Sequence, residues 1–199
     1  MPTLTRTHPT RSLIPALLLP SIALSCKSGD VQRELTPFVR ADFALVDEID
    51  AEISDGFTTL EGETDYDSFR IGFGFLESQE DRLVSRGELL IGSSSFGDLD
   101  AVEIVGGGRF FVGEQAGAIR PYVGFHAVTT ISDSVAGVDL GTQLGLAALG
   151  GLEVPLNENF ALDFGIDYQF PLIAAESDPP GVDTEFQGFA VRAGVVVDF

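Results

Sequence analysis

The sequence has one cysteine, no tryptophan and few basic residues: Lys and Arg together number 11, against 31 Asp and Glu, for a formal net charge of −20. A single cysteine excludes an internal disulfide framework and a zinc site of several cysteines. The shortage of basic residues argues against nucleic acid as a partner, because phosphate binding needs clustered Lys and Arg. After residue 25 no apolar run reaches 18 residues, so the body of the chain is not expected to contain a membrane-spanning helix.

Apolar residues are nevertheless plentiful. Of the 199 residues, 44% are hydrophobic, and the mean hydropathy is +0.22. A chain with this net charge and few apolar residues would be disordered. This chain instead combines its high charge with a large apolar fraction. Its length suits one domain with a sizeable core.

The first 25 residues have the pattern of an export signal. Residues 1–12 carry two arginines and no acid, and residues 13–24 read LIPALLLPSIAL, which is too short to span a bilayer as a helix. We therefore expect a signal peptide over residues 1–25 and a short periplasmic segment over residues 26–34. The sequence before Cys26 resembles a relaxed lipobox, which would make Cys26 a lipidation site; ordinary cleavage beside an unmodified thiol is the alternative.

The rest of the chain alternates with a period of two, which is typical of strands with one apolar face. In the clearest case, Phe160, Leu162, Phe164 and Ile166 alternate with Asp163, Asp167 and small or polar residues. Eight such segments follow residue 34, and most have ten or more residues, which is the length of a strand that crosses a membrane rather than the usual roughly 5–6 residues. The predicted connections alternate between short ones (77–82, 114–117 and 157–159) and mostly longer ones (47–68, 94–100, 131–139 and 174–185).

The two faces of these strands differ in polarity. One face is almost wholly Phe, Leu, Val, Ile and Ala, and the other collects arginines together with carboxylates. Because a soluble barrel would expose its charges, an apolar outside and a charged inside indicate a membrane barrel, which must close to satisfy its backbone. We predict an all-β, eight-stranded antiparallel up-and-down transmembrane barrel over residues 35–199. We also predict a lumen plugged by a charge network of Arg40, Asp42, Arg70, Arg86, Glu88, Glu103, Arg109, Arg120, Glu153, Asp163, Asp167 and Arg192.

Three stretches carry a family resemblance: residues 120–124 (RPYVG), residues 150–168, and the alternating end at Phe199. They resemble the OmpA/OmpX/opacity-type eight-stranded outer-membrane barrels, in which Phe199 would be the C-terminal assembly signal. The resemblance implies the outer membrane of a Gram-negative-type bacterium. Implied partners are outer-membrane lipid, the barrel assembly machinery and an unknown extracellular partner, with the chain a monomer and no nucleic acid bound. With no Trp and three Tyr, any aromatic girdle must be built mainly from Phe.

Two features are candidates for functional sites. Residues 47–67 hold nine acids and no base, which suits a divalent cation or a cationic partner; without D-x-D-x-D-G spacing, a solvated charged loop is the favoured interpretation. His126 is predicted to face inward. Barrels of this shape that deacylate lipid A carry His-x-Ser facing the membrane, whereas His126 is followed by Ala127 and Val128. We expect no catalytic residue, metal or cofactor.

The expected function is therefore structural or interactive at the cell surface, through acidic loops. Two alternatives stay open at this point: a membrane-embedded lipid-modifying enzyme, and a soluble lipocalin-like barrel with its apolar residues inside.

Overall fold

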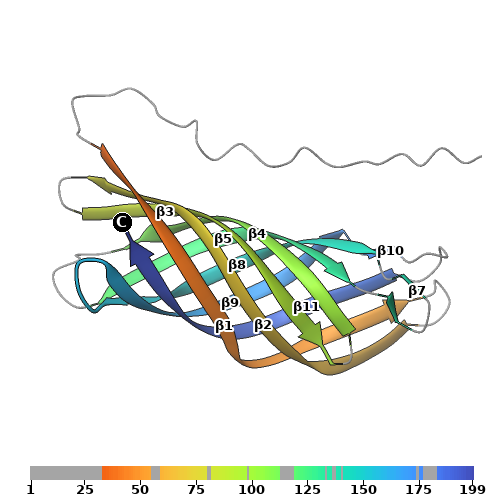
Figure 1. The fold of residues 1–199 in the computed structure, drawn as a ribbon. Helices are drawn as coiled ribbons and strands as arrows, with labels where there is room; N and C mark the ends of the chain where they lie inside the picture. Colours follow the sequence, from red (N-terminus) through yellow and green to blue (C-terminus); the bar gives the residue numbers. More distant parts are fainter. Residues whose placement is uncertain are drawn as a thin grey trace, which may run out of the picture.

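Eight long strands close into one antiparallel barrel (Figure 1). The computed structural model describes residues 33–54, 59–79, 82–97, 99–112, 119–132, 134–135, 138–139, 141–173, 175–176 and 183–199. The expected signal peptide and Cys26 lie outside the described residues. The barrel strands are β1 (Arg33–Ser54), β2 (Thr59–Gln79), β3 (Arg82–Phe96), β4 (Leu99–Phe111), β5 (Arg120–Ser132), β8 (Thr142–Pro155), β9 (Phe160–Ile173) and β11 (Asp183–Asp198).

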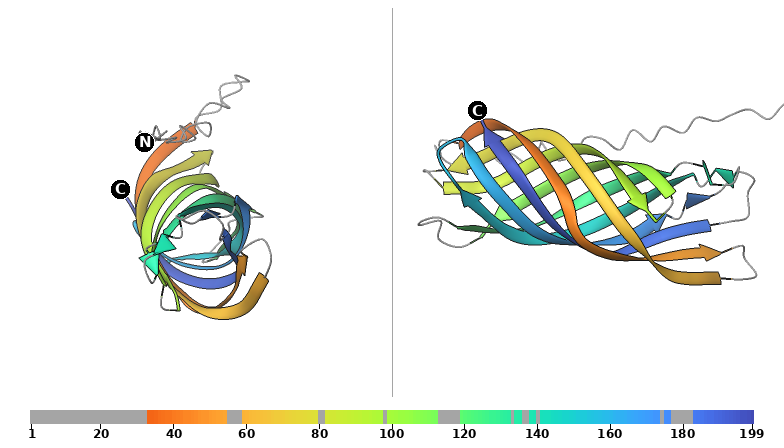
Figure 2. Two further views of the ribbon diagram at one scale, coloured as in Figure 1. Left: turned by 90° about the vertical axis from the view of Figure 1, so that its right-hand side faces the viewer. Right: turned by 60° about the horizontal axis from the view of Figure 1, so that its bottom comes forward.

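Each of the eight barrel strands pairs with the barrel strand that follows it along the chain, and β1 pairs with β11 to close the sheet. Seen from one end, the strands form a ring (Figure 2, left). Three short elements, β6 (Ser134–Val135), β7 (Val138–Asp139) and β10 (Ala175–Glu176), lie in the connections after β5 and β9. Closure leaves no free sheet edge along the barrel wall, which is the condition for a strand structure in lipid. No helix among the described residues is long and apolar enough to cross a membrane.

The apolar face of the strands lies outside. Large hydrophobic side chains are exposed along the wall: Phe73 and Phe125 are each 58% exposed, and many more are about half exposed, among them Phe43, Phe69, Ile71, Phe75, Ile91, Phe110, Val123, Phe164, Ile166 and Phe189. Of the three tyrosines, Tyr168 is the one on this outer face, where its ring lies 4.5 Å from that of Phe189. The aromatic side chains on the outer surface are therefore mainly Phe, as expected.

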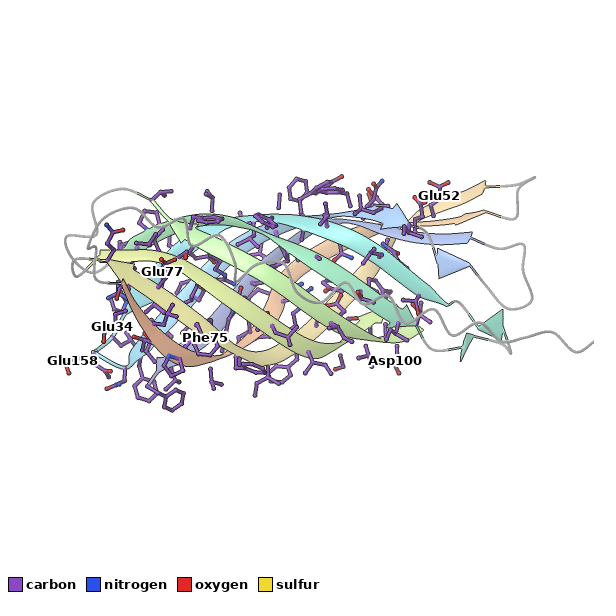
Figure 3. All side chains as sticks on the ribbon, turned by 90° about the horizontal axis from the view of Figure 1, so that it is seen from above. Glu34, Glu52, Phe75, Glu77, Asp100 and Glu158 are labelled. Atoms are coloured by element: carbon purple, nitrogen blue, oxygen red, sulfur yellow. The ribbon has the colours of Figure 1, made fainter. Side chains whose placement is uncertain are left out.

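Charged residues bracket this apolar wall at both ends. In Figure 3, Glu34, Glu77 and Glu158 lie toward one end and Glu52 and Asp100 toward the other, with Phe75 between them. The first end carries the short connections, such as the bend at 156–159 between β8 and β9. The carboxyl-terminal end of β11 lies at this same end, where the Phe199 amide donates to the Pro37 carbonyl.

Two predicted connections are wrong. A loop is expected over residues 47–68, but β1 runs to Ser54 and β2 begins at Thr59, so most of that segment is a long hairpin. A longer loop is also expected over residues 94–100, but β3 ends at Phe96 and β4 begins at Leu99. Gly97 has φ of 60°, a left-handed conformation that favours glycine in so tight a turn.

β1, β2 and β11 extend past the other strands and form a projecting sheet (Figure 2, right). The pairing of β1 with β2 is interrupted between Phe43 and Glu48 and then continues to the pair Ser54–Thr59. By contrast, β3 stops pairing with β2 at Tyr66, and β9 stops pairing with β11 at Gly188. The projecting sheet therefore comprises residues 48–54 of β1, 59–65 of β2 and 183–187 of β11.

Candidate functional site: a charged lumen with an aromatic cap

The charged face of the strands lies inside the barrel. Of the twelve residues predicted for the lumen network, eleven are at most 6% exposed; the exception is Arg120, whose side chain is 26% exposed at the short-turn end. The twelve residues lie on all eight barrel strands. At each strand the alternation that directs Phe and Leu outward directs these charges inward.

Nearest the short turns, Arg86 is the centre of a cluster. Its guanidinium bridges Glu153 and Asp198, with 3.1 Å from Nη2 to Asp198 Oδ1. Arg120 pairs with the second oxygen of Glu153 at 3.1 Å. The Arg86 guanidinium also lies over the Phe38 ring, 4.6 Å from its centroid, in a cation–π arrangement that suits a desolvated arginine.

In the middle of the lumen, Glu88 and Asp163 each face several donors. Glu88 lies 2.8 Å from both Arg109 Nε and His126 Nε2, and 3.4 Å from Arg40 Nη1. Asp163 pairs with Arg40 at 3.2 Å and with Arg109. Tyr122 completes the layer, because its hydroxyl donates to Asp163 at 2.9 Å.

The next layer contains two ion pairs joined by a tyrosine. Arg70 pairs with Glu103 at 2.7 Å, and Arg192 pairs with Asp167 at 2.9 Å. The Tyr66 hydroxyl accepts from both arginines and donates to Glu103 at 2.8 Å. A contiguous polar network of this kind stabilises its own geometry, since each charge is fixed by more than one partner.

Asp42 links this layer to the middle one. It pairs with Arg40 at 2.9 Å and lies 3.5 Å from Arg192. A cavity of about 20 Å³ lies within the network, bordered among others by Asp42, Asp167 and His126. That volume is enough for about one water molecule.

An aromatic cap lies beyond the charges, toward the projecting sheet. The Phe96 and Phe186 rings stack with centroids 4.1 Å apart, and Tyr66 lies 5.0 Å from Phe96. Leu99 and Ala101 are buried in the same cluster. The lumen therefore passes from an ionic interior to an apolar end.

Other residues of the described barrel belong to the charge network without having been assigned to it from the sequence, among them Tyr66, Tyr122 and Asp198. Tyr122 and Asp198 lie on faces that alternation directs inward, and both make contacts within the network. Tyr66 lies in the segment 47–68, for which a loop is expected. All three residues share the parity of the inward charges on their own strands, which is the signal that identifies them.

His126 faces the lumen, as predicted, where it contacts Glu88 and is 3% exposed. In the barrels that deacylate lipid A the histidine faces the membrane, and His126 does not. The lipocalin-like alternative also does not fit, because it requires apolar residues inside and charges outside, and the barrel has the opposite arrangement.

Comparison with solved structures matches this arrangement of strands to known barrels. Neisserial surface protein A superposes with a TM-score of 0.53 at 20% identity, over 82% of this chain and 97% of that one. The chain has the fold of an eight-stranded outer-membrane barrel. Weaker matches are OprG of Pseudomonas aeruginosa (TM-score 0.49, 13% identity, 82% of this chain and 95% of that one) and the N-terminal β-barrel domain of its OprF (0.45, 16%, 81% and 97%).

No protein-family model matches the sequence, and no curated protein matches it. The outer-membrane barrel fold confirms the architecture that the alternation and the family resemblance predicted. The specific role must be argued from the side chains themselves.

Proposed function

We propose that this protein is an integral outer-membrane barrel with a closed lumen that presents an acidic surface to extracellular partners and performs no chemistry. The observation that carries the proposal is the inverted polarity of the barrel: half-exposed Phe, Ile and Val outside, and paired charges inside. Exposed apolar surface on this scale needs lipid, and a membrane barrel offers no free backbone edge within that lipid.

The connections from β5 to β8 and from β9 to β11 are long and lie at the end of the projecting sheet, which supports one orientation in the membrane. We propose that the short turns face the periplasm, with Phe199 as the assembly signal for the barrel assembly machinery, and that Cys26 is a candidate lipid anchor behind a cleaved signal peptide. The barrel would act as a monomer. The projecting sheet would then lie on the outside of the cell, where loops of such barrels are longer.

A closed lumen can be tested by electrical recording. Paired charges cross each layer of the lumen, and breaking these buried ion pairs to open a path would cost free energy. The refolded protein is therefore expected to give no steady conductance in planar bilayers. Stable single-channel openings at low voltage would show instead that the network leaves an ion path.

Membrane location has its own test. The native protein should be recovered in the outer-membrane fraction, and its folded form should migrate differently from the boiled form in detergent gels. Recovery in the soluble fraction would contradict the proposal, whatever the conductance measurement gives.

A further inference from the structure

The projecting sheet has two long edges, one formed by β11 and one by β2, and they differ in how far other groups of the chain hydrogen-bond to them. On the β11 edge, the Gln143 side-chain amide makes two hydrogen bonds with the Phe186 backbone: it donates to the carbonyl at 3.1 Å and accepts from the amide at 3.0 Å. β10 pairs with Thr184 and Asp183 farther along the same edge. The chain's own groups thus occupy much of this edge.

The β2 edge is open in the described part of the chain. The Asp65 carbonyl accepts a hydrogen bond from the Gly97 amide at 2.8 Å, so the backbone N–H and C=O of Asp65 point toward β3 and away from β1. Alternate residues of a strand direct their N–H and C=O to the same side, so those of Glu63, Glu61 and Thr59 also face away from β1. No described strand pairs with them there, because β3 ends its pairing with β2 at Tyr66.

Like charges lie opposite each other across this hairpin. The register places Glu48 opposite Asp65, Asp50 opposite Glu63, and Glu52 opposite Glu61. The side chains of Asp50, Glu63 and Asp65 are exposed. Like charges directly across a strand pair are destabilising, and a cationic neighbour would relieve the repulsion.

We propose that the open edge of β2, from Thr59 to Glu63, binds an extended basic peptide segment of an extracellular partner by strand addition. Main-chain bonds to Thr59, Glu61 and Glu63 would provide the affinity, and Lys or Arg at alternate positions would face the carboxylates. This inference rests on the proposed function for its statement that the edge lies outside the cell. A net charge of −20 would also steer a cationic segment toward the chain.

A second copy of the chain is a poorer occupant. Edge-to-edge pairing of two β2 strands would set Glu61 and Glu63 of one copy against the same acidic strand of the other. Charged residues on an exposed edge are a common protection against such self-pairing. The carboxylates on β2 would repel the same strand of a second copy, and for the same reason they favour binding of a basic strand.

The test uses the full chain refolded in detergent micelles and a labelled eight-residue peptide that alternates Lys and Val. Fluorescence anisotropy is expected to show saturable binding, with no binding of the Glu–Val analogue. Glu63→Pro removes the one N–H of that residue, which faces the open edge, and leaves the bonds between β2 and β1 in place, so it should weaken binding by about tenfold or more.

Two further variants separate backbone pairing from charge. Glu63→Gln keeps the amide and should weaken binding only about two- to fivefold. Glu158→Gln removes the same charge at the opposite end of the barrel and should leave binding unchanged. Gel mobility before and after boiling checks that each variant folds.

If Glu63→Pro does not fold, a Lys–Val peptide with N-methyl groups on the amides that would face β2 serves on the unchanged protein, and it should fail to bind. Equal binding of the N-methylated peptide, or by Glu63→Pro, would overturn strand addition. Absence of peptide binding with concentration-dependent dimers in light scattering would assign the edge to a second copy. None of these results depends on cell fractionation, so the proposed function can fail or survive independently.

Discussion

At the scale of single residues, the lumen is governed by the cost of burying charge. Glu88 is the clearest case, because it is buried and lies within ion-pair distance of Arg109, Arg40 and His126. A buried charge is tolerated when it is paired, and removing one partner leaves the others desolvated and uncompensated. The network should therefore respond strongly to the loss of one carboxylate even when size and shape are kept.

Glu88→Gln should accordingly lower the free energy of unfolding by about 3–5 kcal/mol. The measurement is urea unfolding in lipid vesicles, followed by the difference in gel mobility between folded and unfolded forms. Asp100→Asn is the matched control: it makes the same acid-to-amide change at an exposed site on β4 and should leave the midpoint within error. Equal midpoints for both variants would show that Glu88 is not held by its charge.

Residue roles could be predicted from the sequence only in part. Alternation places Arg192 and Asp167 on inward faces without any knowledge of three-dimensional structure. It does not predict that Arg192 donates to Ser68, 124 positions away in the sequence, at 2.6 Å. That pairing depends on how far each strand is shifted against the next around the closed barrel, and the shift is not encoded in the pattern of any one strand.

At the scale of the strand, the long alternating segments were predictable and the projecting hairpin was not. Its sequence does alternate, since Glu48, Asp50 and Glu52 are interleaved with Ile49, Ala51 and Ile53. The density of acids favoured a loop, because Asp and Glu are depleted in strands. Pairing of β1 with β2 on one side and β11 on the other overrides that preference.

Strand packing inside the lumen also depends on small residues at particular points. Tyr122 lies over Gly151 and Gly165, which leave room for its ring to reach Asp163. A Cβ atom added at Gly151 would lie 2.4 Å from the Tyr122 hydroxyl oxygen and 2.3 Å from the Phe164 carbonyl oxygen. The second contact involves backbone, so β9 would have to move.

Gly151→Ala is therefore expected to destabilise the barrel by about 1–3 kcal/mol, as overpacking does. The neighbouring change Gly150→Ala is the control, because its added Cβ would lie 3.7 Å from the Tyr122 carbonyl oxygen, an ordinary contact. Thermal unfolding of both variants in the same detergent provides the comparison. A Gly151→Ala protein as stable as Gly150→Ala would mean that β8 and β9 can separate there without loss.

At the scale of the whole molecule, everything depends on which face of the wall meets lipid. The composition alone does not decide this, since 44% hydrophobic residues would suit either a soluble core or a lipid-facing wall. What decides it is that the arginines and carboxylates pair with one another across the lumen, while the apolar side chains outside make no comparable core among the described residues. The three buried apolar clusters of the described residues lie inside the barrel and are small.

The absence of tryptophan makes this polarity directly measurable, because one introduced indole reports alone. Phe125→Trp places the indole on the outer wall, where Phe125 is 58% exposed, whereas Phe38→Trp places it in the lumen, where Phe38 is 1% exposed. In vesicles of lipid with brominated acyl chains, the fluorescence of the Phe125→Trp protein should be strongly quenched and that of the Phe38→Trp protein much less, because bromine quenches on contact. Equal quenching would mean that lipid reaches the interior, and stronger quenching of the Phe38→Trp protein would reverse the assignment of inside and outside on which the membrane location rests.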